Sequence, residues 1–193
     1  KIDGSQLLWV VNFYTLFLSS LLLVGGSLGD HFGRKRIFGL GIIIFTLASL
    51  WCGFSSSPLM LIIARAFQGM GGALMVPGSL SLISALFPST KRGWAISVWS
   101  MFSAMTTIIG PALGGFLAGL GLWRVVFFIN VPLALMAIYF LRIVPESIEI
   151  NSKKIDVTGA ILATIALCGL TYGFIEAPDE GFYDVHILIS LIT

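Results

Sequence analysis

One charged stretch interrupts a mostly apolar chain: Gly26-Ser27-Leu28-Gly29-Asp30-His31-Phe32-Gly33-Arg34-Lys35-Arg36. Five titratable residues fall within the seven positions 30–36. The run before them, Leu7–Leu28, carries no charged residue, and neither does the run after them, Ile37–Phe54. Apolar runs of ~20 residues are long enough to cross a bilayer as helices. We therefore predict that the charged stretch is a turn at a membrane surface, between two transmembrane helices.

The composition of the whole chain also indicates a membrane protein. Charged residues make up 10% of the sequence and hydrophobic residues 57%, whereas soluble domains carry about 25% charged residues. The sequence therefore predicts an all-α polytopic membrane protein without a soluble domain. The runs that can span a membrane are Leu7–Leu28, Ile37–Phe54, Leu59–Phe87, Trp94–Leu120, Val125–Leu141 and Val157–Ile175, and a further run begins at Val185.

Basic residues indicate which ends of the spans face the cytoplasm, because Lys and Arg are enriched in short cytoplasmic loops. If positions 30–36 are cytoplasmic, alternation of the spans leaves only Lys1 and Arg124 outside. The start of the chain and the acidic loop 176–184 are then expected outside. Because no signal peptide precedes an outside start, we interpret the chain as an internal fragment. Eight basic residues fall inside: Arg34, Lys35, Arg36, Lys91, Arg92, Arg142, Lys153 and Lys154.

Arg65 is the most informative residue within a span. At ~1.5 Å of helix rise per residue, it lies ~10 Å below the Pro58 end of its helix. A charge at that depth normally faces a protein interior or a water-filled cavity. Gln68 and Gly69 follow at i+3 and i+4 and share a side of the helix with Arg65. We interpret this stripe as the lining of a transport pathway; the alternative is a structural arginine that extends to the interface.

Glycines recur every four residues in two of the predicted helices. In the run Trp94–Leu120, small residues at positions 106, 110, 114 and 118 form a face that lets a second helix approach closely. Pro111, inside this run, is expected to kink the helix. A kinked glycine face suits a surface that rocks, although a static kink that improves packing is the alternative. Gly25, Gly29 and Gly33 have the same spacing, with helix packing and gating both left open.

These motifs resemble signatures of the major facilitator superfamily. The stretch Gly26–Lys35 is similar to the signature between the second and third spans, on the cytoplasmic side. Leu61, Arg65, Gln68, Gly69 and Gly71 are similar to the fourth-span signature. The charge distribution places the first of these motifs on the same side as the resemblance does.

Two further motifs resemble one branch of that family. The sequence Gly110-Pro111-Ala112-Leu113-Gly114-Gly115 is similar to the fifth-span signature associated with antiporters, with Thr106 in place of its first glycine. Trp123-Arg124, followed by Asn130-Val131-Pro132, is similar to the fourteen-span drug:proton antiporter branch. The resemblance implies a partial major-facilitator-type helical bundle. Residues 1–145 are then expected to form an N-terminal six-helix bundle without its first span, and residues 146–193 a cytoplasmic loop with span 7 and the start of span 8.

The resemblance also implies a function: proton-coupled efflux of drugs or other small amphiphilic compounds by a multi-pass transporter of the plasma membrane. Its partners would be the substrate, protons and the lipid bilayer, with no cofactor beyond the proton gradient and no nucleic acid. Asp30 and Arg34 would close a cytoplasmic charge lock to helix ends of the partner bundle, and Arg65 would be a fixed positive charge near the proton path. The implied site residues are a gating motif (Gly26, Asp30, Gly33, Arg34, Lys35), a pathway (Arg65, Gln68, Gly69) and a proton-sealing antiporter-type helix motif (Gly110, Pro111, Gly114, Gly115).

Three other functions are compatible with a polytopic membrane protein. The same fold serves dedicated metabolite or sugar transporters. A non-transporting sensor or scaffold is disfavoured because it would not need a charge such as Arg65 inside a span. A membrane enzyme is disfavoured because the sequence shows no nucleophile–base pair, metal cluster or deep carboxylate dyad. The sequence carries no signal for oligomerisation.

Overall fold

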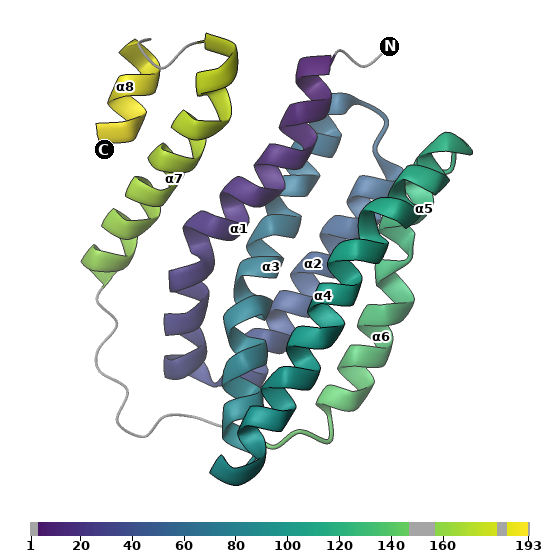
Figure 1. Ribbon diagram of the computed structural model, residues 1–193, viewed down its shortest axis with the longest axis vertical. Helices are drawn as coiled ribbons and strands as arrows, with labels where there is room; N and C mark the ends of the chain where they lie inside the picture. Colours follow the sequence, from purple (N-terminus) through teal and green to yellow (C-terminus); the bar gives the residue numbers. More distant parts are fainter. Residues whose placement is uncertain (1–3, 147–156, 181–184, 193) are drawn as a thin grey trace.

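The computed structural model describes residues 4–146, 157–180 and 185–192 of the chain. Within these ranges every element of regular structure is a helix, as Figure 1 shows. The predicted all-α class is therefore confirmed. The helices are α1 (Gly4–Phe32), α2 (Arg34–Phe54), α3 (Pro58–Leu86), α4 (Ser89–Gly119), α5 (Trp123–Phe128), α6 (Asn130–Leu141), α7 (Val157–Glu180) and α8 (Val185–Ile192).

Five helical segments within the described residues are long and apolar enough to cross a membrane. They are the four long helices α1 to α4, and α5 and α6 taken together as Trp123–Leu141. The apolar part of α7 is the shorter segment Ile161–Phe174. The helix α7 itself continues to Glu180, past the end of the predicted span at Ile175, because backbone hydrogen bonding does not stop where the apolar run stops. Lys153 and Lys154 lie outside the described residues.

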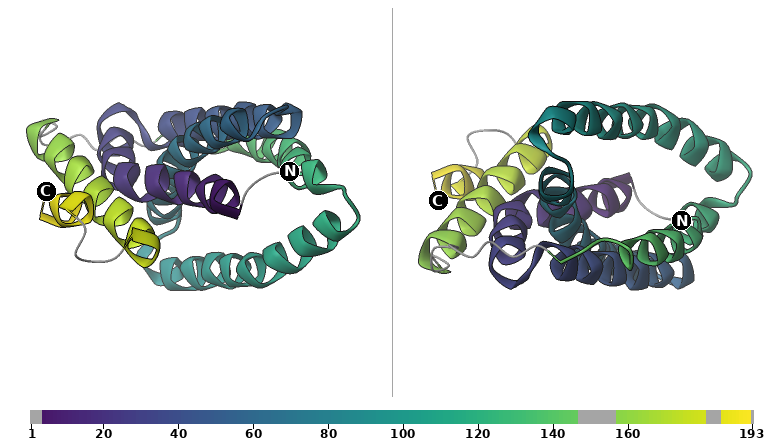
Figure 2. Two further views of the ribbon diagram at one scale, coloured as in Figure 1. Left: turned by 90° about the horizontal axis from the view of Figure 1, so that it is seen from above. Right: turned by 90° about the horizontal axis from the view of Figure 1, so that it is seen from below.

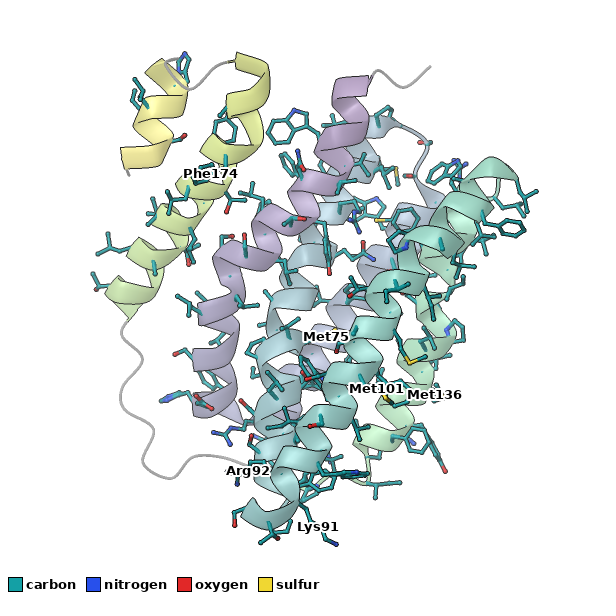
Figure 3. All side chains as sticks on the ribbon, in the orientation of Figure 1. Met75, Lys91, Arg92, Met101, Met136 and Phe174 are labelled. Atoms are coloured by element: carbon teal, nitrogen blue, oxygen red, sulfur yellow. The ribbon has the colours of Figure 1, made fainter. Side chains whose placement is uncertain are left out.

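Successive long helices run in opposite directions. Lys91 and Arg92, at the start of α4, lie at the same end of the bundle as the junction between α1 and α2 (Figure 3). Arg142, at the end of α6, also lies at this end, because its carbonyl oxygen accepts a hydrogen bond from Lys35. The basic residues predicted to be cytoplasmic are therefore gathered at one end of the bundle, as far as they are described.

The helix α3 lies at the centre and packs against α1 and α2 over most of its length. Glycines make these contacts close. A Cβ added at Gly25 would overlap the carbonyl oxygen of Ala73, and one added at Gly71 would lie 2.6 Å from the backbone nitrogen of Phe45. Such backbone-to-backbone contact is typical of small residues between membrane helices. On the other side of α1, Ser19 lies 3.3 Å from the Thr171 hydroxyl of α7.

The charged stretch differs from the predicted turn. The helix α1 continues through Asp30 to Phe32, and Gly33 is the one residue between α1 and α2. Its φ of 106° is a conformation that favours glycine, so a single residue is enough to reverse the chain direction. The predicted glycine stripe is only partly a packing face: Gly25 contacts α3, whereas a Cβ at Gly29 would meet nothing within 4 Å.

The predicted span Val125–Leu141 is divided into α5 and α6 at Ile129. Pro132 explains the division, since it has no N–H to donate to the carbonyl of Phe128 one turn earlier. Asn130 consequently lies in the first turn of α6 rather than in the middle of an unbroken helix. The backbone still turns in the same sense, because Ile129 has helical angles of −56° and −30°.

The helix α4 lies apart from the central helices. Among the described helices it contacts only α3 and α5, and Ala95 is its one buried residue. Figure 2 shows α4 along one side of the bundle, with α1 to α3 on the other. The chain passes through Pro111 without a break in the helix.

Candidate functional site

Asp30 and Arg34 form an ion pair at the junction of α1 and α2. Arg34 Nε donates to Asp30 Oδ1 at 3.0 Å, and Nη2 of the same guanidinium also lies 3.0 Å from that oxygen. Two nitrogens on one carboxylate oxygen bridge the end of α1 and the start of α2. A lock between this pair and a second bundle stays a prediction.

Lys35 and Glu146 cap each other's helices at the same end of the bundle. Lys35 Nζ donates to the carbonyl oxygens of Arg142, at 3.3 Å, and Val144, which follow the last turn of α6. In return Glu146 Oε1 accepts from the backbone N–H of Lys35 at 3.0 Å, in the first turn of α2. A cation thus lies at a helix C-terminus and an anion at a helix N-terminus, the arrangement that helix dipoles favour.

Gly33 leaves room for the Glu146 carboxylate beside the first turn of α2. It is the N-cap residue of α2 and has no side chain to cap the helix itself. A Cβ at this position would lie 2.7 Å from Glu146 Oε1, so the carboxylate occupies the space that a side chain would take. Gly26, the first residue of the motif, faces Pro77 of α3, where a Cβ would lie 3.6 Å away at ordinary contact distance.

Arg65 lies between α3 and α1. Its Nε donates to the carbonyl oxygen of Val10 at 3.0 Å, and its Nη1 donates to Gln68 Oε1 at 2.7 Å. The guanidinium also lies 4.3 Å from the centroid of the Tyr14 ring. All three partners are electrically neutral, so they bind the positive charge without cancelling it. The side chain is directed into the protein, which was one of the two expectations for this residue.

A chain of polar side chains continues from Arg65 across three helices. Gln68 Nε2 donates to Ser49 Oγ of α2 at 2.5 Å, and Asn130 Nδ2 of α6 donates to the same oxygen at 3.1 Å. Cys52 Sγ of α2 lies 3.9 Å from Gln68 Oε1. Gln68 is 2% exposed and Ser49 is fully buried. This polar network, formed by Arg65, Gln68, Ser49 and Asn130, is the most buried polar feature of the described chain.

The other predicted site residues take different positions. A Cβ at Gly69 would overlap the carbonyl oxygen of Tyr14, so this glycine allows α3 to contact α1. Its predicted place in a pathway stays a prediction. Gly110, Gly114 and Gly115, beside Pro111 in α4, would carry a Cβ with nothing within 4 Å among the described residues. Within the described chain, no residue therefore packs against the glycine face of α4.

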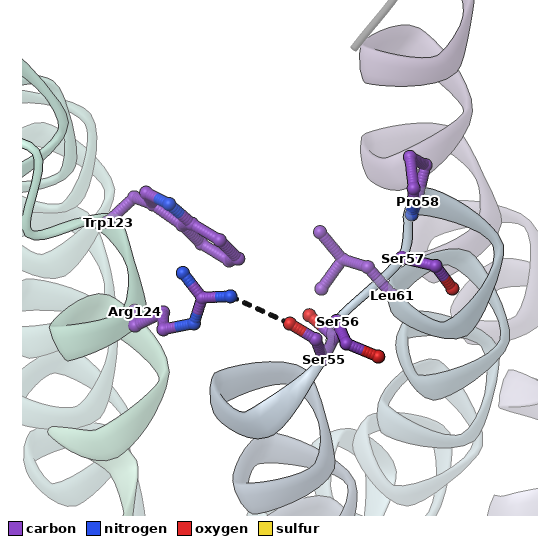
Figure 4. A pocket seen from close by; sticks show the side chains of 7 residues that line it. All are labelled: Ser55, Ser56, Ser57, Pro58, Leu61, Trp123 and Arg124. Carbon is purple, nitrogen blue, oxygen red and sulfur yellow. Dashed lines mark hydrogen bonds between the residues drawn. The ribbon is translucent and has the colours of Figure 1, made fainter. Parts of the chain in front are cut away.

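At the opposite end of the bundle, Arg124 joins α5 to the α2–α3 connection. Its Nη2 donates to the carbonyl oxygen of Ser55 at 2.8 Å, and its guanidinium lies 4.3 Å from the centre of the Trp123 ring. Figure 4 shows the two side chains facing Leu61 across a cavity of about 160 Å³. Because Ser55 is the C-cap residue of α2, Arg124 satisfies a carbonyl that the helix leaves unpaired.

Comparison with known proteins identifies the family. The Major Facilitator Superfamily sequence profile matches residues 1–177 of the chain. This chain belongs to the major facilitator superfamily. Among solved structures, a crystal structure of the peptide transporter POT matches 98% of the chain and 41% of its own length, with a TM-score of 0.63 and 18% identity. At that identity the match shows the fold alone. The multi-pass membrane class follows from the family match and from the five apolar helical segments.

Curated relatives of this major facilitator chain include resistance proteins. It is 35% identical over 99% of its length to the multidrug resistance protein Stp of Mycobacterium tuberculosis. It is 36% identical over 96% to the methylenomycin A resistance protein of Bacillus subtilis. It is 37% identical over 93% to the tetracenomycin C resistance and export protein of Streptomyces glaucescens. The chain spans 36%, 40% and 34% of these three relatives, about a third of a typical relative.

Sequence reasoning missed two residues of the candidate site, Glu146 and Ser49, and it noted Asn130 only as part of a family motif. Glu146 lies five positions after the predicted end of a span at Leu141, and as a lone acidic residue it gave only a weak signal. Ser49 was an ordinary small polar residue within an apolar run. Only the packing of α2, α3 and α6 brings Ser49 and Asn130 together with Gln68.

Proposed function

We propose that the full-length protein is a secondary active transporter, not an enzyme, that exports drugs or other small amphiphilic organic compounds across the plasma membrane in exchange for protons. The names of its relatives support this: they describe multidrug resistance, methylenomycin A resistance, and tetracenomycin C resistance and export. The family supports transport in general, and the resistance names favour export of foreign compounds over uptake of a nutrient.

The observation that carries the proposal is the charge of Arg65 within a membrane-spanning helix. Placing an arginine at the centre of a span costs about 3 kcal/mol or more, and neutral hydrogen-bond partners inside a membrane return only ~0.6 kcal/mol each on average. Val10 and Gln68 offset only part of that cost, and the Tyr14 ring adds a cation–π contact but no negative charge. A positive charge that meets only neutral groups among the described residues supports a role in moving protons or binding a charged substrate.

The proposed mechanism uses the remaining motifs as moving and sealing parts. Arg65 provides a fixed positive charge beside the proton path and favours the ionised form of a nearby acid. The cluster of Asp30, Arg34, Lys35 and Glu146 holds the inner ends of α1, α2 and α6 together while the bundle rocks between two states. The glycine face of α4, at Gly110 to Gly115, provides a surface on which a second bundle closes against proton leakage.

The test uses the full-length protein in energised inside-out vesicles. Lipophilic cations and common antimicrobials are added, and collapse of the proton gradient is followed by the fluorescence of a pH-sensitive dye. We expect collapse that depends on the compound in the wild type and is lost in Arg65→Ala. Arg92→Ala is the matched control, because Arg92 is an exposed arginine at the start of α4 and is expected to retain the response.

Two outcomes would contradict the proposal. A wild type that gives no response across the panel, although folded in the membrane, would favour a dedicated metabolite or sugar transporter. A response that survives in both Arg65→Ala and Arg65→Lys would show that Arg65 is structural. A response lost in Asp30→Asn as well would support the cytoplasmic charge lock, and a wild-type rate in that variant would overturn it.

A further inference from the structure

The orientation of the Gln68 amide is dictated by Arg65. A guanidinium can only donate hydrogen bonds, so the atom of Gln68 that faces Arg65 Nη1 at 2.7 Å must be the oxygen Oε1. The amide nitrogen is thereby directed toward Ser49 Oγ, which accepts from it at 2.5 Å. Each bond fixes the direction of the next one. A change at Ser49 would therefore alter where Gln68 holds its oxygen, and with it the position of the guanidinium.

Ser49 accepts from two helices at once. Besides the bond from Gln68 of α3, it accepts from Asn130 Nδ2 of α6 at 3.1 Å. Both lone pairs of the hydroxyl oxygen are then in use. Ser49 is fully buried, so water cannot replace a lost partner there at low cost. The hydroxyl acts as a fixed acceptor that joins α2, α3 and α6.

Asn130 is the first residue of α6, and its side chain reaches Ser49 of α2 because α6 packs against α2. The far end of α6 is tied to α2 by Lys35, which donates to the carbonyl oxygen of Arg142. The helix α6 is thus joined to α2 both at the cytoplasmic cluster and at the polar network. A displacement of α6 would therefore stretch or break the hydrogen bond from Asn130 to Ser49.

We propose that Ser49 and Asn130 are positioning residues for transport: through Gln68 they hold the Arg65 guanidinium where proton coupling requires it. The proposal rests on the proposed function, and it concerns residues that reach Arg65 only through Gln68. It also gives a physical route by which α6 affects Arg65, namely three consecutive hydrogen bonds from Asn130 to Ser49, Gln68 and Arg65. A purely structural role would stabilise the bundle without affecting the rate of coupling.

The experiment compares Ser49→Ala, Ser49→Thr and Asn130→Leu in the full-length protein, reconstituted in proteoliposomes. The compound is the member of the vesicle panel that gives the largest proton flux. We expect Ser49→Ala to lower the maximal proton-coupled rate about tenfold with little change in the apparent affinity for the compound. Ser49→Thr retains the hydroxyl and should restore most of the rate. Asn130→Leu keeps a side chain branched at Cγ but removes the amide at a half-buried position, and it should lower the rate in the same way.

The matched control is Thr46→Val on the same helix. The Thr46 hydroxyl donates only to the carbonyl of Ile42, within α2, so its removal should leave the rate unchanged. The proposal also predicts non-additivity: in an Arg65→Lys background, Ser49→Ala should cause no further loss, because the two residues act as a unit. An equal loss in both backgrounds, or wild-type rates for Ser49→Ala and Asn130→Leu, would overturn the proposal.

A second measurement separates this proposal from the proposed function. If the wild type shows no compound-dependent proton flux, the proposed function fails, and the network is then tested by thermal unfolding. Ser49→Ala and Arg65→Lys should shift the unfolding midpoint by less together than the sum of their separate shifts, because they lie on one hydrogen-bonded chain. Additive shifts would refute the positioning role whether or not transport is observed.

Discussion

The helices α3 and α4 follow each other in sequence and differ mainly in what surrounds them. They have 29 and 31 residues, and an apolar stretch of 18 residues in each has a mean hydropathy of 1.6 in α3 and 1.5 in α4. Yet 44% of the residues in the α3 stretch are buried within the described chain, and none of those in the α4 stretch are. Length and hydropathy therefore predict that a helix enters the membrane, but not whether it meets protein or another environment there.

Glycines of the two helices show the same contrast at the level of single residues. Gly69 and Gly71 of α3 contact the backbones of α1 and α2, whereas Gly110 and Gly114 of α4 meet nothing within 4 Å. In α3 the missing side chains permit a permanent helix contact. In α4 they leave a smooth face whose partner is not among the described residues. The first kind of glycine should matter for folding and the second kind for movement.

The largest expected effect distinguishes these two kinds of glycine. Gly69→Val would force a side chain into the carbonyl oxygen of Tyr14, and overpacking of this sort costs about 1–3 kcal/mol or more. We expect the yield of monodisperse full-length protein after detergent extraction to fall severely. Gly114→Val should keep that yield within about twofold of wild type while lowering transport. Equal yields for the two variants would mean that the contact of Gly69 with α1 is not a folding constraint.

A smaller effect is expected at the N-terminal end of α2. Glu146→Ala removes the carboxylate that accepts from the backbone of Lys35, and loss of a capping acceptor costs about 1 kcal/mol. The unfolding midpoint of the full-length protein should fall accordingly. Arg36→Ala is the comparison, because Arg36 lies 3.5 Å from Glu146 but its side chain is 74% exposed. An equally large loss in Arg36→Ala would show that the ion pair, and not the cap, stabilises α2.

The smallest effect is expected at the opposite end of the bundle. Arg124→Lys should weaken the hydrogen bond to Ser55 and the contact with Trp123, together worth about 1 kcal/mol. A modest fall in the unfolding midpoint, measured beside Arg92→Ala as a neutral control, would agree with this estimate. A fall in the midpoint much larger than that of Glu146→Ala would mean that α5 is held mainly by this one arginine.

Local spacing explains which parts were predictable from the sequence. The spans and the shared helix side of Arg65 and Gln68 were predicted, because they depend on residues within one or two helical turns. The ion pair of Asp30 with Arg34 is equally local but was not predicted. The partners of Ser49 and Lys35 were not predictable, because Asn130 is 81 positions away from Ser49 and Glu146 is 111 positions away from Lys35. Their polarity alone does not indicate a direction, and only the packing of α2 on α6 supplies it.

The spacing of the glycines shows a case in which a local pattern predicted more contact than the structure contains. Intervals of four residues predicted a close-packing face at Gly25, Gly29 and Gly33 and again at Gly110 and Gly114. The structure places only Gly25 of the first set against the α3 backbone, and it shows no neighbour for Gly29. Spacing shows which residues share a face of a helix. It carries no information on whether another helix covers that face.

The cap that Glu146 provides has a consequence for how the protein is made. The first turn of α2 is synthesised well before its acceptor, which follows 111 positions later. At common translation rates that distance corresponds to about 5–20 s. During this interval the free N–H groups in the first turn of α2 must donate to water or to lipid phosphate, the kind of anion that helix N-termini bind. The N-terminal end of α2 is therefore capped only after α6 and Glu146 have been synthesised. A ribosome that stalls before residue 146 would leave the hairpin of α1 and α2 without this cap.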